Sequence, residues 1–462
     1  MEFVVGILLL LTFFGLAYYC IKGHNLMIGF LIITILWTAL SFLGAAFASP
    51  EFLSTTAFYS NGEPVKAIAI LNKIYQSAPE GWGTTLVNVC WGAWFGRVLM
   101  ETGIASTLIR KTVELGGDRP IITIVLLNVV TAFIFTAMMG AGPVIAIGVI
   151  VLPIMMSLGV PKAIAMFSFM ESVAAGIYLN PVNFAQYRAF FIEVDEMPNF
   201  TLGWYAGKWG YAALVISVVV TTILAGFFLK KSKTSHAWAA QTRGASEQKD
   251  APLYTLILPI VPVVLKIWLD FSVIGGFVIA GFAALFLCGK MKGSFKENCQ
   301  LVNKLYYDGV VDTAPLVGFL LTLPMFNTCA SYASPYFKEV LVGIMPTNEY
   351  VVCALFAALS ILGFFRGPLT LYGCGAATLG VLSAVGHFSV PFLFCVFTIP
   401  ATTVNVGSCI TQSWIAWGLA YTKVESRDYL KLSIPFAYIC SILLYILTAF
   451  TVTGLGPEWF LS

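Results

Sequence analysis

Apolar stretches about as long as a membrane-spanning helix recur along the whole of this 462-residue sequence. A helix needs about 20 apolar residues to cross the hydrocarbon core of a bilayer. The first stretch begins at Phe3 and is too long for the core of a signal peptide, so we expect it to be retained. The predicted spans are residues 3–22, 26–48, 84–100, 119–138, 142–159, 161–180, 203–229, 253–269, 272–288, 310–327, 349–365, 369–385, 390–408 and 432–455.

Charged residues are too few to cover the surface of a soluble protein of this length. They make up 10% of the chain, whereas soluble chains carry about 25%. The net charge of +3 is spread over short loops and forms no patch for nucleic acid. The ten cysteines and three histidines lack the spacing of a metal site, a disulfide framework or a catalytic triad. We therefore expect an all-α polytopic membrane protein that is not an enzyme and needs no cofactor.

The longest polar stretch, residues 230–252, divides the chain into two halves. It is rich in lysine, so the positive-inside rule places it in the cytoplasm. We expect the protein to lie in the inner cell membrane. The predicted division is an N-terminal half at 1–229, this cytoplasmic linker, and a C-terminal half at 253–462.

Charge and aromatic content indicate the structure of several smaller segments. A second basic loop is predicted at 289–300, and Asp308 and Asp312 after it are expected to be solvated. Residues 62–80 and 329–345 mix charged with apolar side chains, which fits either interfacial amphipathic segments or plain loops. Four tryptophans are expected to anchor span ends or pack the core rather than to form a site: Trp82, Trp91, Trp94 and Trp204.

Each half contains apolar segments interrupted by glycine and proline. TAMMGAGPVIAIGVIVLPIMMSLGVP before KAIAMFSFMESVAAGIYLNPVN corresponds to FRGPLTLYGCGAATLGVLSAVGHFSVP before FLFCVFTIPATTVNVGSCITQS. The Val-Pro pairs at 160 and 390 give an offset of 390 − 160 = 230. Paired interruptions are typical of transporters with two inverted-topology repeats, re-entrant hairpins and broken helices; chance similarity of apolar sequence is the alternative. We expect the repeats at about 83–190 and 305–415.

The glycines and prolines at these interruptions are expected to open the helices at membrane depth. Pro143 and Pro368 each remove a backbone donor, and Gly142 and Gly367 loosen the helix. Because unpaired backbone groups are costly in hydrocarbon, such breaks must line a cavity or be buried in protein. Broken ends expose N–H groups that attract anions and carbonyls that can hold a cation. We therefore predict that Gly142, Pro143 and Gly367 contribute to a substrate site.

Arg366 stands beside the second interruption, in FFRGPLTLYG. An arginine at the bilayer centre costs about 2.5–3.5 kcal/mol on insertion scales, so it is expected to face a polar cavity or a partner. Its guanidinium fork fits a carboxylate bidentately. We predict that Arg366 clamps a substrate carboxylate; snorkelling to the interface or structural pairing with an acid are the alternatives.

Glu171 lies deep in the apolar stretch AMFSFMESVAAG. Burial favours the neutral form of a carboxyl group, which suits a proton carrier; a structural carboxyl, neutral or paired with arginine, is the alternative.

Neutral donors and acceptors at the two other breaks could bind substrate or sodium, or could cap helices: Asn180, Asn183, Asn405, Ser408, Thr411 and Gln412.

These segments resemble two families of secondary carriers. GTTLVNVCWGAWFGRVLMETGIASTLIRKTVELGG from Gly83, VLPIMMSLGVPKAIA and FFRGPLTLYG are similar to the gluconate permeases, and the last match implies Arg366 and Thr370 as site residues. The N-terminal span with IKGHNLMIGFLIITIL, and the later WGLAYTKVESRDYLKLSIP, resemble the anaerobic four-carbon dicarboxylate carriers. The chain has Tyr178-Leu179-Asn180-Pro181 where gluconate permeases have a Pro-Pro-His-Pro element, which argues against a sugar acid.

Both families belong to the ion transporter superfamily. The resemblance implies a homodimer with two inverted repeats that takes up or exchanges organic anions, driven by protons or sodium. We therefore predict an alternating-access symporter of a small carboxylate, either a sugar acid or a di- or tricarboxylate. A sodium/proton antiporter is the alternative, because it also needs a buried acid such as Glu171. A membrane-embedded enzyme and a channel are disfavoured, since the sequence shows neither a catalytic cluster nor a charged filter ring.

Overall fold

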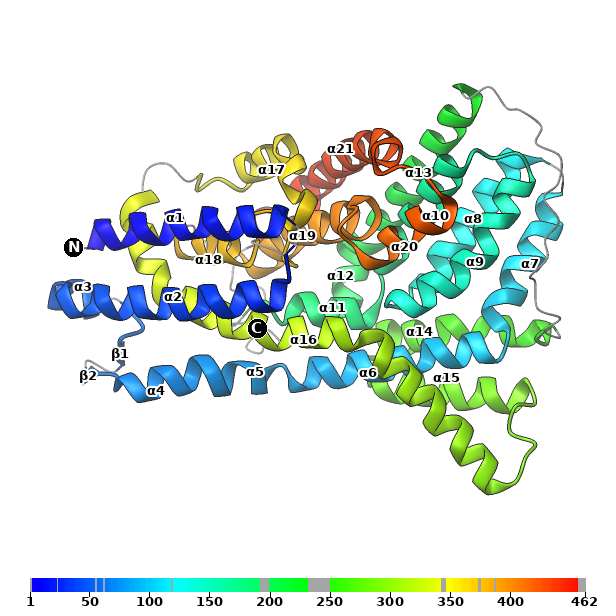
Figure 1. The fold of residues 1–462 in the computed structure, drawn as a ribbon, viewed down its shortest axis with the longest axis horizontal. Coiled ribbons are helices and arrows are strands. Elements are labelled where there is room, and N and C mark those ends of the chain that lie inside the picture. The colour runs from blue at the N-terminus through cyan, green and yellow to red at the C-terminus, as the bar shows by residue number, and fades with distance from the viewer. Residues whose placement is uncertain are drawn as a thin grey trace.

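The computed structural model describes residues 2–22, 24–54, 56–60, 63–117, 119–191, 199–231, 250–341, 346–372, 375–385 and 388–455 (Figure 1). The α-helices are α1 Glu2–Ile21, α2 Leu26–Phe47, α3 Pro50–Ser54, α4 Ala67–Asn72, α5 Ala78–Gly81, α6 Gly83–Glu101, α7 Ile104–Gly116, α8 Pro120–Phe135, α9 Ala141–Ser157, α10 Lys162–Ile177, α11 Pro181–Arg188, α12 Leu202–Tyr205, α13 Tyr211–Lys231, α14 Val261–Leu269, α15 Val273–Leu287, α16 Phe295–Leu341, α17 Glu349–Ala358, α18 Gly375–Val385, α19 Val390–Ile399, α20 Ser413–Thr422 and α21 Ser426–Thr451. Tighter or wider helical segments are η1 Lys73–Ser77, η3 Ala206–Gly210, η4 Leu253–Ile260, η5 Ser360–Arg366 and η6 Pro400–Ser408. Strands β1 Tyr59–Ser60 and β2 Glu63–Pro64 form one short antiparallel pair. The predicted all-α fold is confirmed.

The helices have the length and composition of a multi-pass membrane protein. Four described helices could cross a membrane: Met27–Phe47, Leu202–Lys231, Val390–Thr422 and Ser426–Thr451. Two bent pairs would add a span each, α10 with α11 at 67° and α17 with η5 at 64°. Outer helices expose large apolar side chains such as Phe14, Ile223 and Phe450, as lipid-facing surfaces do.

Helix α16 is longer than the sequence predicted. It runs without a break from Phe295 to Leu341 and packs against α1, α2 and α6 (Figure 1). The basic loop predicted at 289–300 therefore ends at α16, and the described part of 329–345 is helix rather than loop. Buried side chains recur every three or four residues through Leu320, Leu323, Phe326, Ala330 and Ala333. This one-sided packing explains why the segment mixes charged with apolar residues.

Residues 62–80 were predicted to be interfacial or loop, and they are largely helical. From Ala67 onward α4, η1 and α5 lead into α6 almost in line (Figure 1). When the offset between the Val-Pro pairs is applied, 67–101 falls on 297–331, which lies inside α16. Each repeat therefore begins with a long helix, and the two long helices pack against one another.

The rest of each repeat follows the same order of elements. The same offset takes α8 to 350–365, where α17 and η5 lie, and α10 to 392–407, where α19 and η6 lie. It takes α11 to 411–418, in the first turns of α20. The repeats predicted from the Val-Pro offset thus have matching architectures.

The two broken helices run in opposite directions where they meet. Three side-chain hydrogen bonds join them: Glu171 with Ser408, Tyr178 with Thr403, and Tyr187 with Thr402. Residue numbers rise along one helix while they fall along the other. Equivalent helices of opposite direction are what inverted-topology repeats require.

Both predicted hairpin interruptions are present. Residues 136–140 separate α8 from α9 and are not helical. In the second repeat, helical dihedral angles end before Phe364, and residues 367–372 form turns before α18. Gly140, with φ +93°, and the consecutive residues Phe365 and Arg366, with φ of 54° and 59°, turn the chain at these points.

Close packing of α10 on α8 depends on Gly176. A Cβ at this position would overlap the backbone carbonyl of Ala132 on α8, which cannot move without shifting the helix. We expect Gly176→Ala to lower the free energy of unfolding by about 1–3 kcal/mol. Thermal unfolding of the purified protein measures this change. Gly226→Ala in α13 is the matched control, because a Cβ there meets nothing within 4 Å and alanine favours a helix; equal melting temperatures for the two variants would contradict the packing argument.

Candidate functional site

The break between α10 and α11 is organised by Asn180. Its Oδ1 accepts hydrogen bonds from the backbone N–H groups of Val182 and Asn183, which caps α11, and Pro181 occupies the first helical turn. Its Nδ2 donates to the carbonyls of Phe135 and Met138 at the first hairpin. Asn180 therefore holds the broken helix and the first hairpin together.

Helix α11 also contacts the second repeat. The Tyr372 hydroxyl in the second hairpin donates to Gln186 Oε1 at 2.7 Å. The neighbouring Tyr187 shares a hydrogen bond with Thr402 and packs its ring 5.5 Å from that of Tyr372. Gln186 Nε2 lies 3.9 Å from the sulfur of Met139 in the first hairpin. One short helix thus contacts both hairpins and the opposite broken helix.

A buried carboxyl group lies at the second helix break. Glu171 of α10 is fully buried, and its Oε1 accepts a hydrogen bond of 2.7 Å from Ser408. Its Oε2 has no hydrogen-bond partner among the described residues. A Cβ on Gly407 would overlap this oxygen, and Tyr429 donates to the Gly407 carbonyl. The structure therefore brings together two predicted site residues, Glu171 and Ser408, that are 237 positions apart.

Other predicted polar residues lie along the same breaks. Both side-chain polar atoms of Asn405 are buried without a partner among the described residues, and so are Thr370 Oγ1 and Asn183 Oδ1. Thr411 lies 3.0 Å from Cys409 Sγ, and Gln412 precedes the first residue of α20. Such unsatisfied buried groups are costly in a membrane interior and mark a polar region inside the protein.

The structure places Arg366 within its own hairpin. The side chain is half-buried, and Nη1 donates to the carbonyl of Tyr372 at 3.3 Å. The adjacent N–H of Phe365 points to Cys409 Sγ at 3.1 Å, so this turn packs on the second helix break. Gly367 lies close to the Leu362 carbonyl and leaves no room for a Cβ.

Gly142 and Pro143 lie in a different setting, at the start of α9. A Cβ on Gly142 would overlap the carboxylate of Asp312 in α16, and an added Cβ on Gly96 of α6 would lie 3.2 Å from Pro143. Asp312 was expected to be solvated, and it is instead held bidentately by Arg97 of α6, with oxygen–nitrogen distances of 2.6 and 2.5 Å. These residues form a close contact between α6, α9 and α16.

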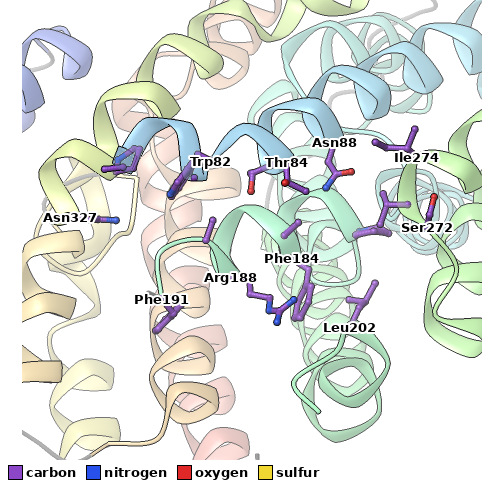
Figure 2. Close-up of a pocket in the computed structure, with 18 of the residues that line it drawn as sticks. Trp82, Thr84, Asn88, Phe184, Arg188, Phe191, Leu202, Ser272, Ile274 and Asn327 are labelled. Carbon is purple, nitrogen blue, oxygen red and sulfur yellow. The ribbon is translucent and has the colours of Figure 1, made fainter. Parts of the chain in front are cut away.

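A cavity of about 660 Å³ lies along the opposite face of α11, which we call the α11 cavity. Figure 2 shows it between Thr84 and Asn88 of α6 and Phe184 and Arg188 of α11, with Asn327 of α16 at one end and Ser272 and Ile274 at the other. Lys266 also lines it and pairs with Asp270 at 2.6 Å. Both side-chain atoms of Asn327 are buried without a described partner. Trp82, expected to be an anchor or a packing residue, forms part of the wall.

Sequence reasoning missed the polar residues of this cavity. Asn88, Arg188 and Asn327 were not singled out, although each interrupts an apolar or half-apolar helix, and Arg188 closes the half-helix that follows the Asn180 break. A search for polar side chains one or two turns beyond a helix break would have found Arg188. Among the predicted substrate ligands, none lines the α11 cavity as the structure describes it.

Comparison with known proteins supports the fold. No protein-family description matches the sequence, and no curated protein is similar to it. The chain is similar in structure to the Alcanivorax borkumensis YdaH transporter, whose crystal structure is described as having an unusual topology. The TM-score is 0.61 at 12% identity, over 95% of this chain and 100% of that one. At this identity the likeness concerns the fold alone.

Proposed function

We propose that this protein is a secondary carrier that moves a small organic anion across a membrane by alternating access. The observation that carries the proposal is the α11 cavity, which sets two cationic side chains and two amides against the half-helix of a broken span. Its fold, shared with a transporter, supports the same class of function.

The chemistry of the cavity suits a carboxylate of modest size. A volume of about 660 Å³ lies within the range of small-molecule sites. Arg188 offers a planar fork of donors and Lys266 an ammonium group, while Asn88 and Asn327 can bind hydroxyl or carbonyl oxygens. We propose a sugar acid or a di- or tricarboxylate as substrate, with the broken-helix polar groups contacting it during the transport cycle.

Glu171 is the proposed carrier of the coupling ion. Its carboxyl group has one hydrogen-bond donor and forms no ion pair with a described residue. A charged carboxylate in this setting would be strongly destabilised, which suits a group that carries a proton in its neutral form. The tight approach of Gly407 to Oε2 leaves little space for a hydrated cation. We therefore favour protons over sodium as the coupling ion.

A sodium/proton antiporter is the second candidate, because Glu171 is the one fully buried acid among the described residues, and such proteins use a buried acid. The carrier and the antiporter are distinguished by screening the purified protein for thermal stabilisation by sugar acids and by di- and tricarboxylates, with and without sodium. A carrier of organic anions is stabilised by one of these classes. Stabilisation by sodium alone, with no response to any anion, would favour the antiporter.

Arg188→Gln tests the cavity as the anion site. We expect the dissociation constant of the stabilising anion to rise on the order of tenfold to a hundredfold, because hydrogen bonds to charged groups contribute about 1.5–3 kcal/mol. Isothermal titration of the purified protein measures the constant. Arg427→Gln makes the same chemical change at an exposed position in α21 and should leave affinity unchanged. Equal affinities for both variants would move the substrate away from the α11 cavity.

A further inference from the structure

The two repeats differ in how their hairpins meet the long helices. By the offset that relates the repeats, Trp82 corresponds to Asp312 and Arg97 corresponds to Asn327. Trp82 and Asn327 both line the open α11 cavity. Their counterparts, Asp312 and Arg97, are joined in the bidentate ion pair. Two positions that line a cavity in one half of the molecule therefore correspond to two positions that are in direct contact in the other half.

The hairpins show the same difference. Gly142 of the first hairpin touches the Asp312 carboxylate directly, and Gly140 lies against Thr313. The corresponding residue of the second hairpin, Tyr372, is separated from Trp82 by Phe190, whose ring lies 6.0 Å from Tyr372 and 5.4 Å from Trp82. At the tip of the first hairpin, Gly142 thus meets the long-helix residue Asp312 directly, whereas Tyr372 of the second hairpin reaches Trp82 only through Phe190.

We propose that the Arg97–Asp312 pair closes a second access route, and that it opens in the alternate state of the carrier as the α11 cavity closes. Because the two repeats have inverted topology, each can adopt the conformation that the other has in this structure. The contact that is closed here, between Arg97 and Asp312, is therefore expected to be open in the alternate state. The route would be lined by Arg97, Asp312 and residues 140–143. This inference rests on the proposed carrier function, although not on the identity of the substrate.

The pair is suited to closing a route reversibly. Its side chains are only partly shielded, with 29% of Arg97 and 13% of Asp312 exposed, so both charges can be hydrated again when they separate. The Asp312 carboxylate also lies at the first turn of α9, where the helix dipole favours a negative charge. Removing the carboxylate charge of Asp312 weakens its ion pair with Arg97 and its interaction with the α9 dipole. The conformational equilibrium then shifts toward the state in which the second access route is open.

Two cysteine reporters test this reciprocity without any substrate. Thr313→Cys places a thiol in the closed contact, where Thr313 is 1% exposed, and Thr84→Cys places one in the α11 cavity. Each is made in the native protein and in Asp312→Asn, and labelling by a water-soluble maleimide is followed peptide by peptide with mass spectrometry. We expect Asp312→Asn to speed labelling at position 313 on the order of tenfold and to slow labelling at position 84.

Folding and charge are controlled within the same experiment. Native Cys395 and Cys440 are buried and should stay unlabelled, since their reaction would indicate unfolding. Asp428→Asn removes a carboxylate from an exposed pair with Lys431 and should change neither reporter. Unchanged labelling of the Thr313→Cys reporter in Asp312→Asn, or reporters that change in the same direction, would overturn the inference. A reciprocal shift in a protein that binds no organic anion would instead leave the inference standing and reject the proposed substrate class.

Discussion

Glu171→Gln is expected to abolish proton-driven accumulation of the substrate while leaving the protein folded. Glutamine has nearly the shape of the protonated glutamate, and its side-chain oxygen can still accept the hydrogen bond from Ser408, so the contact across the helix break is kept. It cannot release a proton, so the empty carrier is fixed in one charge state. Uptake into proteoliposomes under an imposed pH gradient should fall to the level of empty liposomes. Exchange of internal for external substrate, which needs no net proton movement, should persist.

Ser408→Ala is the matched control for this result. It removes the one hydrogen bond that Glu171 accepts from a described residue and keeps the ionisable group. We expect proton-driven uptake to continue in this variant with altered pH dependence. Native-like accumulation by Glu171→Gln would reject the proton role of Glu171. Accumulation by the native protein that requires a sodium gradient would assign the coupling to sodium instead.

The helix breaks could be predicted from the sequence because their causes are local. Pro181 at the start of α11 and the glycines and prolines at 140–143 and 367–368 disrupt helices through their own backbone chemistry. The Val-Pro offset predicted the order of elements in both repeats for the same reason. Asn180 was a candidate for either binding or capping, and the structure shows the capping contacts.

The partners of the polar side chains could not be predicted, because they lie far away in the chain. Asp312 was expected to be solvated, but its partner Arg97 is 215 positions distant. Glu171 was singled out correctly as a buried acid, yet nothing in its neighbourhood pointed to Ser408. The length of α16 was underestimated for a related reason: charged residues in its sequence suggested loops, whereas packing against α1, α2 and α6 decides the structure. Tertiary contacts here override local composition.

The cavity was missed because its residues are ordinary within their own segments. Asn88 stands in a helix of mixed polarity, and Asn327 lies in the middle of α16. Arg188 ends a short helix, where a basic residue also complements the helix dipole. The 67° bend between α10 and α11 carries Arg188 to the space that Asn88 of α6 and Asn327 of α16 also line.

Arg366→Ala is expected to abolish anion uptake without unfolding the protein. Arg366 and Phe365 both adopt left-handed backbone conformations, which cost of order 1–3 kcal/mol each and persist only where surrounding contacts hold them. The bond from Arg366 to the Tyr372 carbonyl is one such contact, and Tyr372 in turn donates to Gln186 of α11. Loss of the guanidinium therefore removes the predicted carboxylate clamp and also disturbs the hairpin that reaches α11.

Two measurements separate these roles of Arg366. If the guanidinium binds the substrate, Arg366→Ala loses thermal stabilisation by the anion as well as uptake, and Arg366→Lys recovers part of both because the charge remains. If it only shapes the hairpin, the anion still binds in the α11 cavity through Arg188 while transport stops. Tyr372→Phe removes the bond to Gln186 but keeps the carbonyl that Arg366 uses, so it should slow transport and leave binding intact. Normal uptake by Arg366→Ala would exclude both roles, since neither a clamp nor a hairpin contact could then limit the transport cycle.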